Sequence, residues 1–368
     1  MKIKINDLSG QYKIINKSVN KRISSVLKHG KYILGPEVYE LEDLLAKYTK
    51  SSYCITVSSG TDALLISLLA IGIKPNDEVI TASFSFGATS EVLKLIGAKP
   101  VYVDVERLTG NINANKISEK ITKKTKAIIA VSLYGQVSDM DEINKIAKLH
   151  GNIPVIEDAS QSFGALYKNR RSCNLSLIGC TSFFPTKPLG CYGDGGAIFT
   201  NNKALYEKCK KLRIHGQKNK YNYEYIGING RLDTIQAAVL LSKMEIFESE
   251  LSKRKQIAEI YKHYLEKFNI EFIREKKDYI SVYAQFTVLL KKRDKIAYEL
   301  MKNGIECAIH YPKPLSEINI YDGIRNNKAT PVANQLARDV LSIPFHPYLS
   351  EKMIIRIINK LVEYESKR

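Results

Sequence analysis

The chain has 368 residues, of which 44% are hydrophobic and 26% are charged, and its formal net charge at pH 7 is +18. A chain of this length can bury one large domain with a smaller companion, and no apolar run is long enough to cross a membrane as a helix. Its six cysteines are scattered without a CxxC pair, which argues against a disulfide framework and a zinc site, so no metal is expected.

The positive charge is spread along the chain. The lysines occur in short groups such as "KKTK", "KCKK" and "KKRD", and they form neither an arm nor a helix stripe with interleaved aromatic residues. Solvated surfaces explain this distribution better than nucleic acid does, although a positive charge can also steer small anions. We therefore expect no nucleic-acid partner and no membrane insertion. The opening "MKIKINDLSGQYK" is polar and lacks a signal segment, so the expected location is the cytoplasm.

In chain order, an N-terminal arm over residues 1–34 precedes a helix in "EVYELEDLLAKY", for which Gly35-Pro36 is a typical start. From about residue 53, short β-branched runs alternate with helical patterns, as in "YCITV" before "TDALLISLLAIGI" and "DEVITA" before "GATSEVLKLIGA". This rhythm predicts strands of a mostly parallel sheet joined by helical crossovers. Runs without alternation, such as "AIIAV", are typical of strands covered on both faces. We predict a large α/β domain over residues 35–245.

After Arg231 the pattern predicts one long helix, which starts in "RLDTIQAAV" and ends near Phe268 in "YLEKF". Beyond it follow "YISVYAQFTVLL", the helix "RDKIAYELMKNG", the strand-like "IECAIHY" and a last helix "EKMIIRIINKLVEYE". These segments predict a compact α+β unit. Residues 246–368 would then comprise a long linking helix and a small C-terminal domain.

Chemically active residues follow several of the predicted strands. In open α/β sheets, ligands bind outside the carboxyl ends of the strands. After "YCITV", the turn "SSGT" at 58–61 opens a helix, where free N–H groups and the helix dipole favour a phosphate, but ordinary helix caps have the same composition. After "IPVIE" comes Asp158, followed three residues later by Gln161, and a helix N-cap explains this carboxylate equally well.

Two further strand ends carry aromatic residues and a lysine. Phe84 and Phe86 in "SFSFGA" follow "DEVITA", and core packing is the simpler explanation for either ring. In "SFFPTKPLGCYGDGG", Lys187 lies five residues after Ser182 among apolar neighbours, and the glycines allow close backbone approach. Loss of solvation would lower the pKa of Lys187 and make its neutral amine available to form a Schiff base. The alternative is a lysine whose amine reaches from an apolar strand end to water.

These separate signals complement one another. A phosphate seat, a ring that can lie on a flat cofactor, an acid and an imine-forming lysine are the parts that pyridoxal 5'-phosphate requires. An acid beside the pyridine nitrogen would keep that nitrogen positively charged, and the ring would then stabilise the carbanion left when an α proton departs. The sequence therefore predicts one cofactor site.

The chain resembles the DegT/StrS family of nucleotide-sugar aminotransferases over nearly its whole length. The resemblance rests on "SSGTDALLISLLAIGIKPNDEVI", "VIEDASQSFGA", "SFFPTKPLGCYGDGGAIFT", "HGQ" and "IGINGRLDTIQAA". It implies the fold type I architecture of the aspartate aminotransferase superfamily. That architecture is an α/β fold with a large, mostly parallel sheet domain and a small C-terminal α+β domain.

By this resemblance, Lys187 forms the Schiff base with the cofactor and Asp158 pairs with the pyridine nitrogen. Gln161 would reach the ring hydroxyl, and Phe86 would stack on the ring. The resemblance implies that the phosphate is held by Gly60, Thr61 and Ser182 of one subunit and by Asn229 of the second subunit. The resemblance thus implies a homodimer with shared active sites.

The resemblance also suggests the substrates. Related sugar 3-dehydratases have histidine where this chain has Lys187, so transamination is expected, with L-glutamate as the amino donor. Ser132 in "VSLYGQ" replaces the histidine of the usual "VHLYG". This variant is similar to the branch that acts on the UDP-keto-sugar UDP-2-acetamido-2-deoxy-3-keto-glucuronate in surface-polysaccharide synthesis.

Three residues are candidates for the sugar. Arg231, beside Asn229, would bind the sugar carboxylate from the second subunit, with a surface salt bridge as the alternative. His310 and Tyr311 in "IHYPKPL" would face the nucleotide-sugar, although a core histidine would also explain His310.

Two other functions stay open at this point. The first is a 4-keto nucleotide-sugar aminotransferase, which would make a 4-amino-4,6-dideoxy sugar. The second is a DNA-binding regulator, for which the sequence shows no helix-turn-helix and no basic stripe.

Overall fold

The computed structural model describes residues 2–321 and 330–366. Met1 of the predicted arm, and residues 322–329, 367 and 368 of the predicted C-terminal domain, lie outside the described residues. In the described ranges, no helix is both long enough and apolar enough to cross a bilayer.

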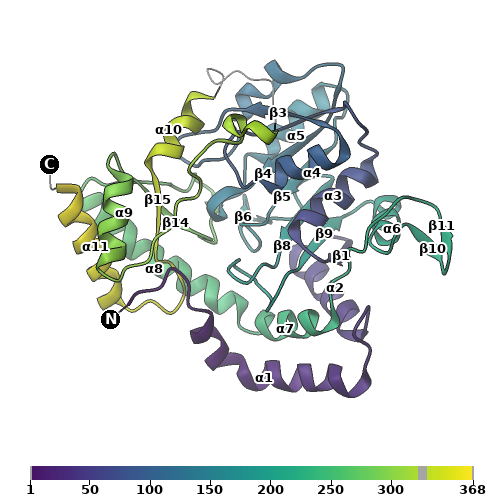
Figure 1. Cartoon of the computed structure of the whole chain (residues 1–368), viewed down its shortest axis with the longest axis horizontal. Helices are drawn as coiled ribbons and strands as arrows, with labels where there is room; N and C mark the ends of the chain where they lie inside the picture. The colour runs from purple at the N-terminus through teal and green to yellow at the C-terminus, as the bar shows by residue number, and fades with distance from the viewer. Residues whose placement is uncertain (1, 322–329, 367–368) are drawn as a thin grey trace.

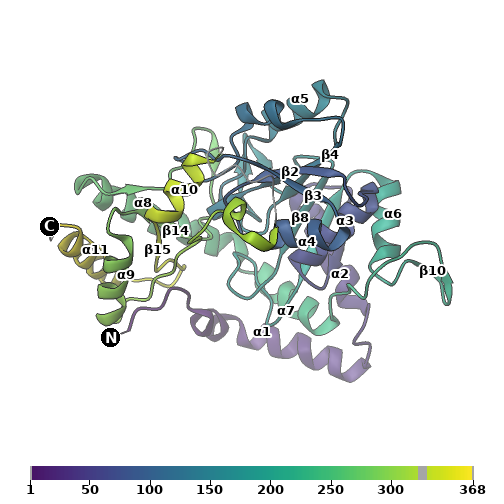
Figure 2. The ribbon, with the colours of Figure 1, turned by 45° about the horizontal axis from the view of Figure 1, so that its top comes forward.

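A seven-stranded sheet forms the centre of the larger part of the molecule (Figures 1 and 2). In spatial order its strands are β1 (Tyr53–Val57), β9 (Gly196–Thr200), β8 (Ile178–Ser182), β5 (Val155–Asp158), β4 (Thr125–Val131), β2 (Glu78–Ala82) and β3 (Lys99–Val103). The five strands from β8 to β3 run parallel, and β9 runs antiparallel to both of its neighbours. The predicted α/β fold with a mostly parallel sheet is confirmed.

Both faces of this sheet are buried. Ile128 and Ile129 of β4 point to opposite faces, because side chains alternate along a strand, and both are fully buried. The apolar run without alternation therefore comes from a strand covered on both sides. The α-helices of this part are α2 (Pro36–Thr49), α3 (Gly60–Ile71), α4 (Ala88–Ile96), α5 (Met140–Leu149) and α6 (Lys203–Leu212).

Several short elements connect the larger ones. They are the 3-10 helices η1 (Ala114–Lys116), η2 (Ser118–Lys120), η3 (Leu133–Gly135), η4 (Leu315–Glu317) and η5 (Asn319–Tyr321), and the strands β6 (Leu166–Tyr167), β7 (Arg170–Arg171), β10 (Gln217–Asn219) and β11 (Asn222–Tyr223).

The predicted single helix after Arg231 is two helices, α7 (Thr234–Met244) and α8 (Phe247–Lys267). The break lies at Glu245 and Ile246, and Ile246 packs onto the cluster that contains Val239 of α7. Most of α7 is buried, whereas α8 buries one face only. The break between the two helices lets α8 leave the large sheet. The spacing of apolar residues continues through the break, so the sequence does not indicate it.

A second core lies beyond α8. A three-stranded antiparallel sheet is formed by β12 (Glu271–Phe272), β14 (Phe286–Leu289) and β15 (Val340–Ile343). It packs with α8, α9 (Arg293–Lys302) and α11 (Glu351–Ser366), and α10 (Pro331–Asp339) precedes β15. The segment "YISVYAQFTVLL" divides into β13 (Tyr279–Ile280), which pairs with β6, and β14. The strand-like "IECAIHY" forms no regular strand and contributes two isolated bridges, Ile305 with Ile3 and Ala308 with Ser342.

The predicted arm carries a helix, α1 (Leu8–His29), that runs along α7 (Figure 1). Ile15 and Val19 of α1 are buried against Val239. Before α1, the N–H of Ile3 donates to Gly304 O at 2.7 Å, and Ile5 O accepts from the N–H of Phe345 at 3.2 Å. The arm thus contacts both cores. The domain boundaries at residues 34 and 245 stay a prediction.

A buried ion pair connects α2, β1 and the residue after α6. Glu42 and Arg213 are 7% and 3% exposed, and Arg213 donates to Glu42 Oε1. The same oxygen accepts from the N–H of Thr56 at 2.8 Å, and Arg213 donates to Thr56 O at 2.8 Å. Removing one member would leave the other charge buried without its partner.

Glu42→Ala is therefore expected to destabilise the fold by about 3–5 kcal/mol. Urea unfolding followed by circular dichroism measures the change. The control is Glu142→Ala, which removes an exposed pair with Lys145 and should change stability by about 0–1 kcal/mol. Equal effects of the two substitutions would contradict the role of the buried pair.

Candidate active site

A cavity of about 450 Å³ lies at the carboxyl ends of β5 and β8 and at the start of α3. Nine of the residues singled out in the sequence line it, namely Gly60, Thr61, Phe86, Asp158, Gln161, Ser182, Lys187, His310 and Tyr311. The structure therefore brings together residues that are separated by up to about 250 positions in the chain.

The start of α3 forms one end of the cavity. Ser59 is the N-cap, and its hydroxyl accepts from the N–H of Asp62 at 3.0 Å. The first amides of a helix have no intrahelical partner, so Gly60 and Thr61 present N–H groups at the positive end of the helix dipole. A Cβ on Gly60 would lie 2.7 Å from Cβ of Ser182 at the end of β8. Only glycine allows the helix and this strand to approach so closely, which makes a compact seat for an anion.

Asp158 is the last residue of β5, and Lys187 lies in the loop after the adjacent parallel strand β8. Asp158 is 6% exposed, and its carboxylate accepts from the N–H of Ser160 at 3.1 Å. Burial raises the pKa of Asp158, while hydrogen bonds from Ser160 and the charge of Lys187 oppose this shift. Burial lowers the pKa of Lys187, and the charge of Asp158 opposes that shift. The two side chains thus act on each other within one cavity.

Gln161 has a fixed orientation because both ends of its amide are bonded. Its Oε1 accepts from the N–H of Tyr134 at 2.8 Å, and its Nε2 donates to the hydroxyl of Tyr311 at 3.1 Å. His310 lies beside them, and burial together with the charge of Lys187 lowers its pKa to about 4. Its imidazole is therefore neutral at pH 7.

The two phenylalanines of "SFSFGA" have different environments. Phe84 is fully buried in the core, whereas Phe86 is 58% exposed and lines the cavity, with its ring 6.1 Å from that of Tyr311. The core-packing explanation therefore holds for Phe84, and the ring of Phe86 is free to contact a ligand.

Asn229 and Arg231 are absent from the described residues that line the cavity. Arg231 Nε donates to Asn229 Oδ1 at 2.8 Å, and Asn229 is exposed. Both residues are predicted to act in the site of a second subunit. Because the structure contains one chain, their roles stay a prediction.

Several lining residues were not identified from the sequence, among them Ser160, Thr186 and Gln285. Thr186 directly precedes Lys187, and Ser160 lies between Asp158 and Gln161. Their closeness in sequence to predicted site residues could therefore have identified them. Gln285 lies almost a hundred residues from Lys187 and has no motif around it.

Residues 133–136 have a structural role that no motif in the sequence indicates. Besides bonding Gln161, Tyr134 donates through its hydroxyl to the carbonyl of His310. The next residue, Gly135, accepts from the N–H of Val282 at 3.0 Å, and a Cβ there would lie 2.6 Å from the backbone nitrogen of Tyr283. This segment therefore joins the large sheet to the small one.

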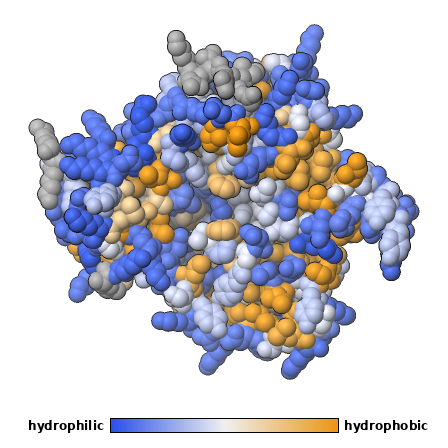
Figure 3. All heavy atoms as spheres, in the orientation of Figure 1, coloured by the Kyte–Doolittle hydropathy of each residue, from blue (hydrophilic) through white to orange (hydrophobic). Residues whose placement is uncertain are grey.

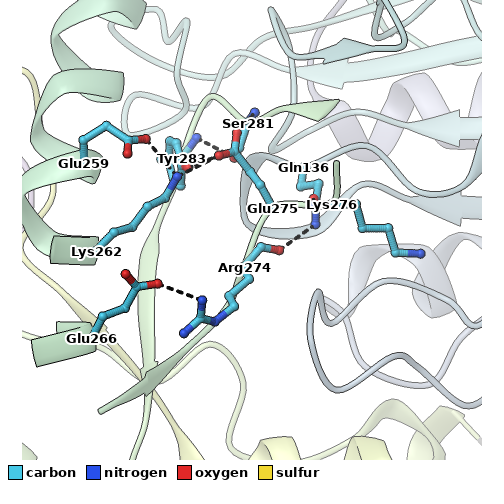
Figure 4. Close-up of polar contacts among 9 residues, drawn as sticks. All are labelled: Gln136, Glu259, Lys262, Glu266, Arg274, Glu275, Lys276, Ser281 and Tyr283. Atoms are coloured by element: carbon cyan, nitrogen blue, oxygen red, sulfur yellow. Dashed lines mark hydrogen bonds and ion pairs between the residues drawn. The ribbon is translucent and has the colours of Figure 1, made fainter. Parts of the chain in front are cut away.

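Gln136 holds the same segment in place. Its Nε2 donates to Arg274 O at 3.2 Å, and its Oε1 accepts from the N–H of Lys276 at 2.6 Å. In Figure 4, Glu275 between these two residues meets Lys262, with an Nζ–Oε2 distance of 2.9 Å, and the hydroxyl of Tyr283. Residues 274–276 are thus held by Gln136 on one side and by Lys262 and Tyr283 on the other.

Gln136→Leu is expected to loosen this connection, because it leaves the N–H of Lys276 and the carbonyl of Arg274 unpaired. Loss of about 1–1.5 kcal/mol would accelerate hydrogen exchange of the amides in 133–136 and 274–283 by about tenfold. Mass-detected hydrogen exchange measures this rate. Gln256→Leu, at an exposed glutamine of α8, is the matched control, and unchanged exchange in Gln136→Leu would contradict the assignment.

Comparison with known proteins identifies the family. The model of the DegT/DnrJ/EryC1/StrS aminotransferase family matches residues 13–362. The chain is 49% identical over 353 residues to UDP-2-acetamido-2-deoxy-3-oxo-D-glucuronate aminotransferase of Pseudomonas aeruginosa, which covers 96% of this chain and 97% of that protein. It is 38% identical over 368 residues to the pleiotropic regulatory protein of Geobacillus stearothermophilus, covering 99% of each.

Solved structures agree with this result. The crystal structure of NtdA from Bacillus subtilis with bound cofactor PMP has a TM-score of 0.88 and 31% identity, over 96% of this chain and 82% of that chain. The sheet, the cavity at its edge and these similarities lead to one conclusion: the chain belongs to the DegT/DnrJ/EryC1/StrS aminotransferase family.

Proposed function

We propose that this chain uses pyridoxal 5'-phosphate to transfer the amino group of L-glutamate to the 3-keto group of UDP-2-acetamido-2-deoxy-glucuronate. The observation that carries the proposal is the placement of Asp158, Lys187 and the first turn of α3 around one cavity. A carboxylate, an amine and an anion seat are the three groups that this cofactor needs.

The residues of the cavity fit the cofactor in charge as well as in type. Burial makes the charged form of Asp158 unfavourable, and a cationic pyridine nitrogen beside it would offset that cost. Lys187 has a lowered pKa, so that its neutral amine is accessible for imine formation. The N–H groups of Gly60 and Thr61 and the hydroxyl of Ser182 would hold the phosphate.

When bound, pyridoxal 5'-phosphate supplies an electron sink that stabilises negative charge on the carbon that loses its proton. Lys187 Nζ would take the α proton from glutamate and, in the second half of the reaction, deliver a proton to C3 of the sugar. Phe86 would cover one face of the cofactor ring, and Gln161 would bond the ring hydroxyl. His310 and Tyr311 would contact the nucleotide-sugar from the other side of the cavity.

Similarity to the Pseudomonas aeruginosa enzyme over nearly the full length supports the 3-keto uronate as the substrate. Such a sugar carries a carboxylate, and the described lining residues of the cavity contain no arginine. Arg231 of a second subunit would supply the planar cation that this group prefers. The product would enter surface-polysaccharide synthesis.

A homodimer with shared sites is part of the proposal. Large apolar side chains are exposed on α1, in the connection after it and on α2, including Tyr12, Ile14, Leu27, Ile33 and Tyr39. Figure 3 shows hydrophobic patches in the region where Figure 1 places α1 and α7. An uncovered apolar area of this kind is typical of a protein interface. It supports a second subunit whose Asn229 and Arg231 complete the cavity.

A cytoplasmic location is supported by six cysteines that are all unpaired. Membership of an aminotransferase family supports an enzyme and not the DNA-binding regulator that the sequence left open.

Lys187→Ala is expected to abolish the visible absorption of the bound cofactor and to lower turnover by at least about a thousandfold. Absorption spectra and a coupled assay for 2-oxoglutarate measure the two effects. Lys203→Ala, at an exposed lysine of α6, should change neither. Conversion of the keto sugar by Lys187→Ala at the wild-type rate would refute the assignment.

The position of amination is tested with two purified substrates. The enzyme, glutamate and UDP-2-acetamido-2-deoxy-3-keto-glucuronate should give a 3-amino sugar, detected by mass spectrometry. A UDP-linked 4-keto-6-deoxy sugar should react at least about a hundredfold more slowly, because it lacks the carboxylate that Arg231 would bind. Preference for the 4-keto sugar would replace the proposal with the alternative that the sequence left open.

A further inference from the structure

A second cavity of about 110 Å³ adjoins the first. Thr186, Gln285 and His310 line both cavities, so the two share a wall at the residue next to Lys187. The smaller cavity lies where the N-terminal arm meets the small sheet, with Asn6 on one side and Ser342 of β15 on the other. No role proposed so far uses this space.

The side chain of Gln285, which lines both cavities, has unused hydrogen-bonding capacity. Its Oε1 is buried and has no hydrogen-bond partner within the described ranges. Other polar groups of the wall bond each other, since His310 Nδ1 lies 2.9 Å from Ser342 Oγ, which lies 2.9 Å from the hydroxyl of Thr287. A buried acceptor without a donor is energetically unfavourable. A ligand whose N–H or O–H group reaches Gln285 Oε1 would remove this cost.

The walls of the cavity define the chemistry of that ligand. Its described lining residues include no lysine, arginine, aspartate or glutamate. His310 is neutral at pH 7, because its pKa is lowered to about 4. A carboxylate would lose its hydration there without meeting a cation, which is unfavourable. The side-chain carboxylate of the amino donor is therefore a poor occupant.

The rest of the lining favours a group that is partly apolar. Five of the residues are hydrophobic, namely Ile5, Ala284, Ala308, Ile343 and Phe345. The volume corresponds to about three or four water molecules in the liquid. A small neutral amide that ends in a methyl group matches the size, the polar side chains and the apolar floor.

We propose that this cavity binds the 2-acetamido group of the sugar, and that Gln285 Oε1 accepts a hydrogen bond from the acetamido N–H. The methyl group lies on the apolar floor. C2 of the sugar is bonded to C3, the carbon that reacts beside Lys187, so the substituent at C2 enters the neighbouring space past Thr186. This inference rests on the proposed function and adds the group that separates acetamido sugars from their 2-hydroxy counterparts.

The test uses two stable nucleotides that differ only at C2, UDP-2-acetamido-2-deoxy-glucuronate and UDP-glucuronate. Their binding to the cofactor-loaded enzyme is measured by isothermal titration calorimetry. The wild type is expected to bind the acetamido form at least about tenfold more tightly, as one hydrogen bond and a buried methyl group would provide. Gln285→Leu, which keeps the size of the side chain, should reduce this preference to about threefold or less.

Gln256→Leu is the matched control and should keep the wild-type preference. Asn6→Ala, on the arm side of the same cavity, is a second variant in case Gln285→Leu does not fold, and it too should lower the preference. Equal binding of the two nucleotides by the wild type, or full preference in both cavity variants, would overturn the inference.

Failure of this inference can be told apart from failure of the proposed function. Wild-type enzyme that aminates the 3-keto acetamido sugar but does not distinguish the two nucleotides would keep the function and remove the acetamido site. Wild-type enzyme that aminates no 3-keto UDP-sugar would remove the proposed function, and the acetamido site with it.

Discussion

The parallel pairing of β5 with β8 is the constraint on which the site depends. Adjacent parallel strands end at the same edge of a sheet, so the residue that closes β5, Asp158, faces the loop after β8 that carries Lys187. Burial opposes the charge of each group, and their mutual attraction favours it. The sheet thus holds an acid and an amine at a place where burial disfavours the charged form of each. A cationic ring between them would stabilise the carboxylate.

The second core completes this edge from the other side. The 133–136 segment leaves β4 and bonds Gln161, His310 O and the 274–282 region at the same time. A shift of the small sheet would therefore change the positions of the Gln161 amide and of His310. The arm adds Ile5 and Asn6 to the wall behind Thr186. Three parts of the chain that are distant in sequence meet around one lysine.

The distribution of charge separates the two cavities. Lys187 and Asp158 line the larger one, which suits a cofactor with an anionic phosphate and a cationic ring. The smaller one has only neutral lining residues. A nucleotide-sugar carries both kinds of group, so adjoining charged and neutral compartments allow one ligand to be recognised at several of its substituents.

The sequence by itself determined the parallel sheet and most of the cavity. Strand and helix periodicity are local properties, and strand ends in such a sheet face one site, so the positions of Gly60, Asp158 and Lys187 after predicted strands were enough to group them. Only the tertiary structure decided the bend at Ile246, the isolated bridge at Ala308 and the place of Gln285. These depend on which surfaces pack together over long separations in the chain, and no local pattern of residues encodes such contacts. The assignment of Asn229 and Arg231 depends in the same way on contacts between two chains.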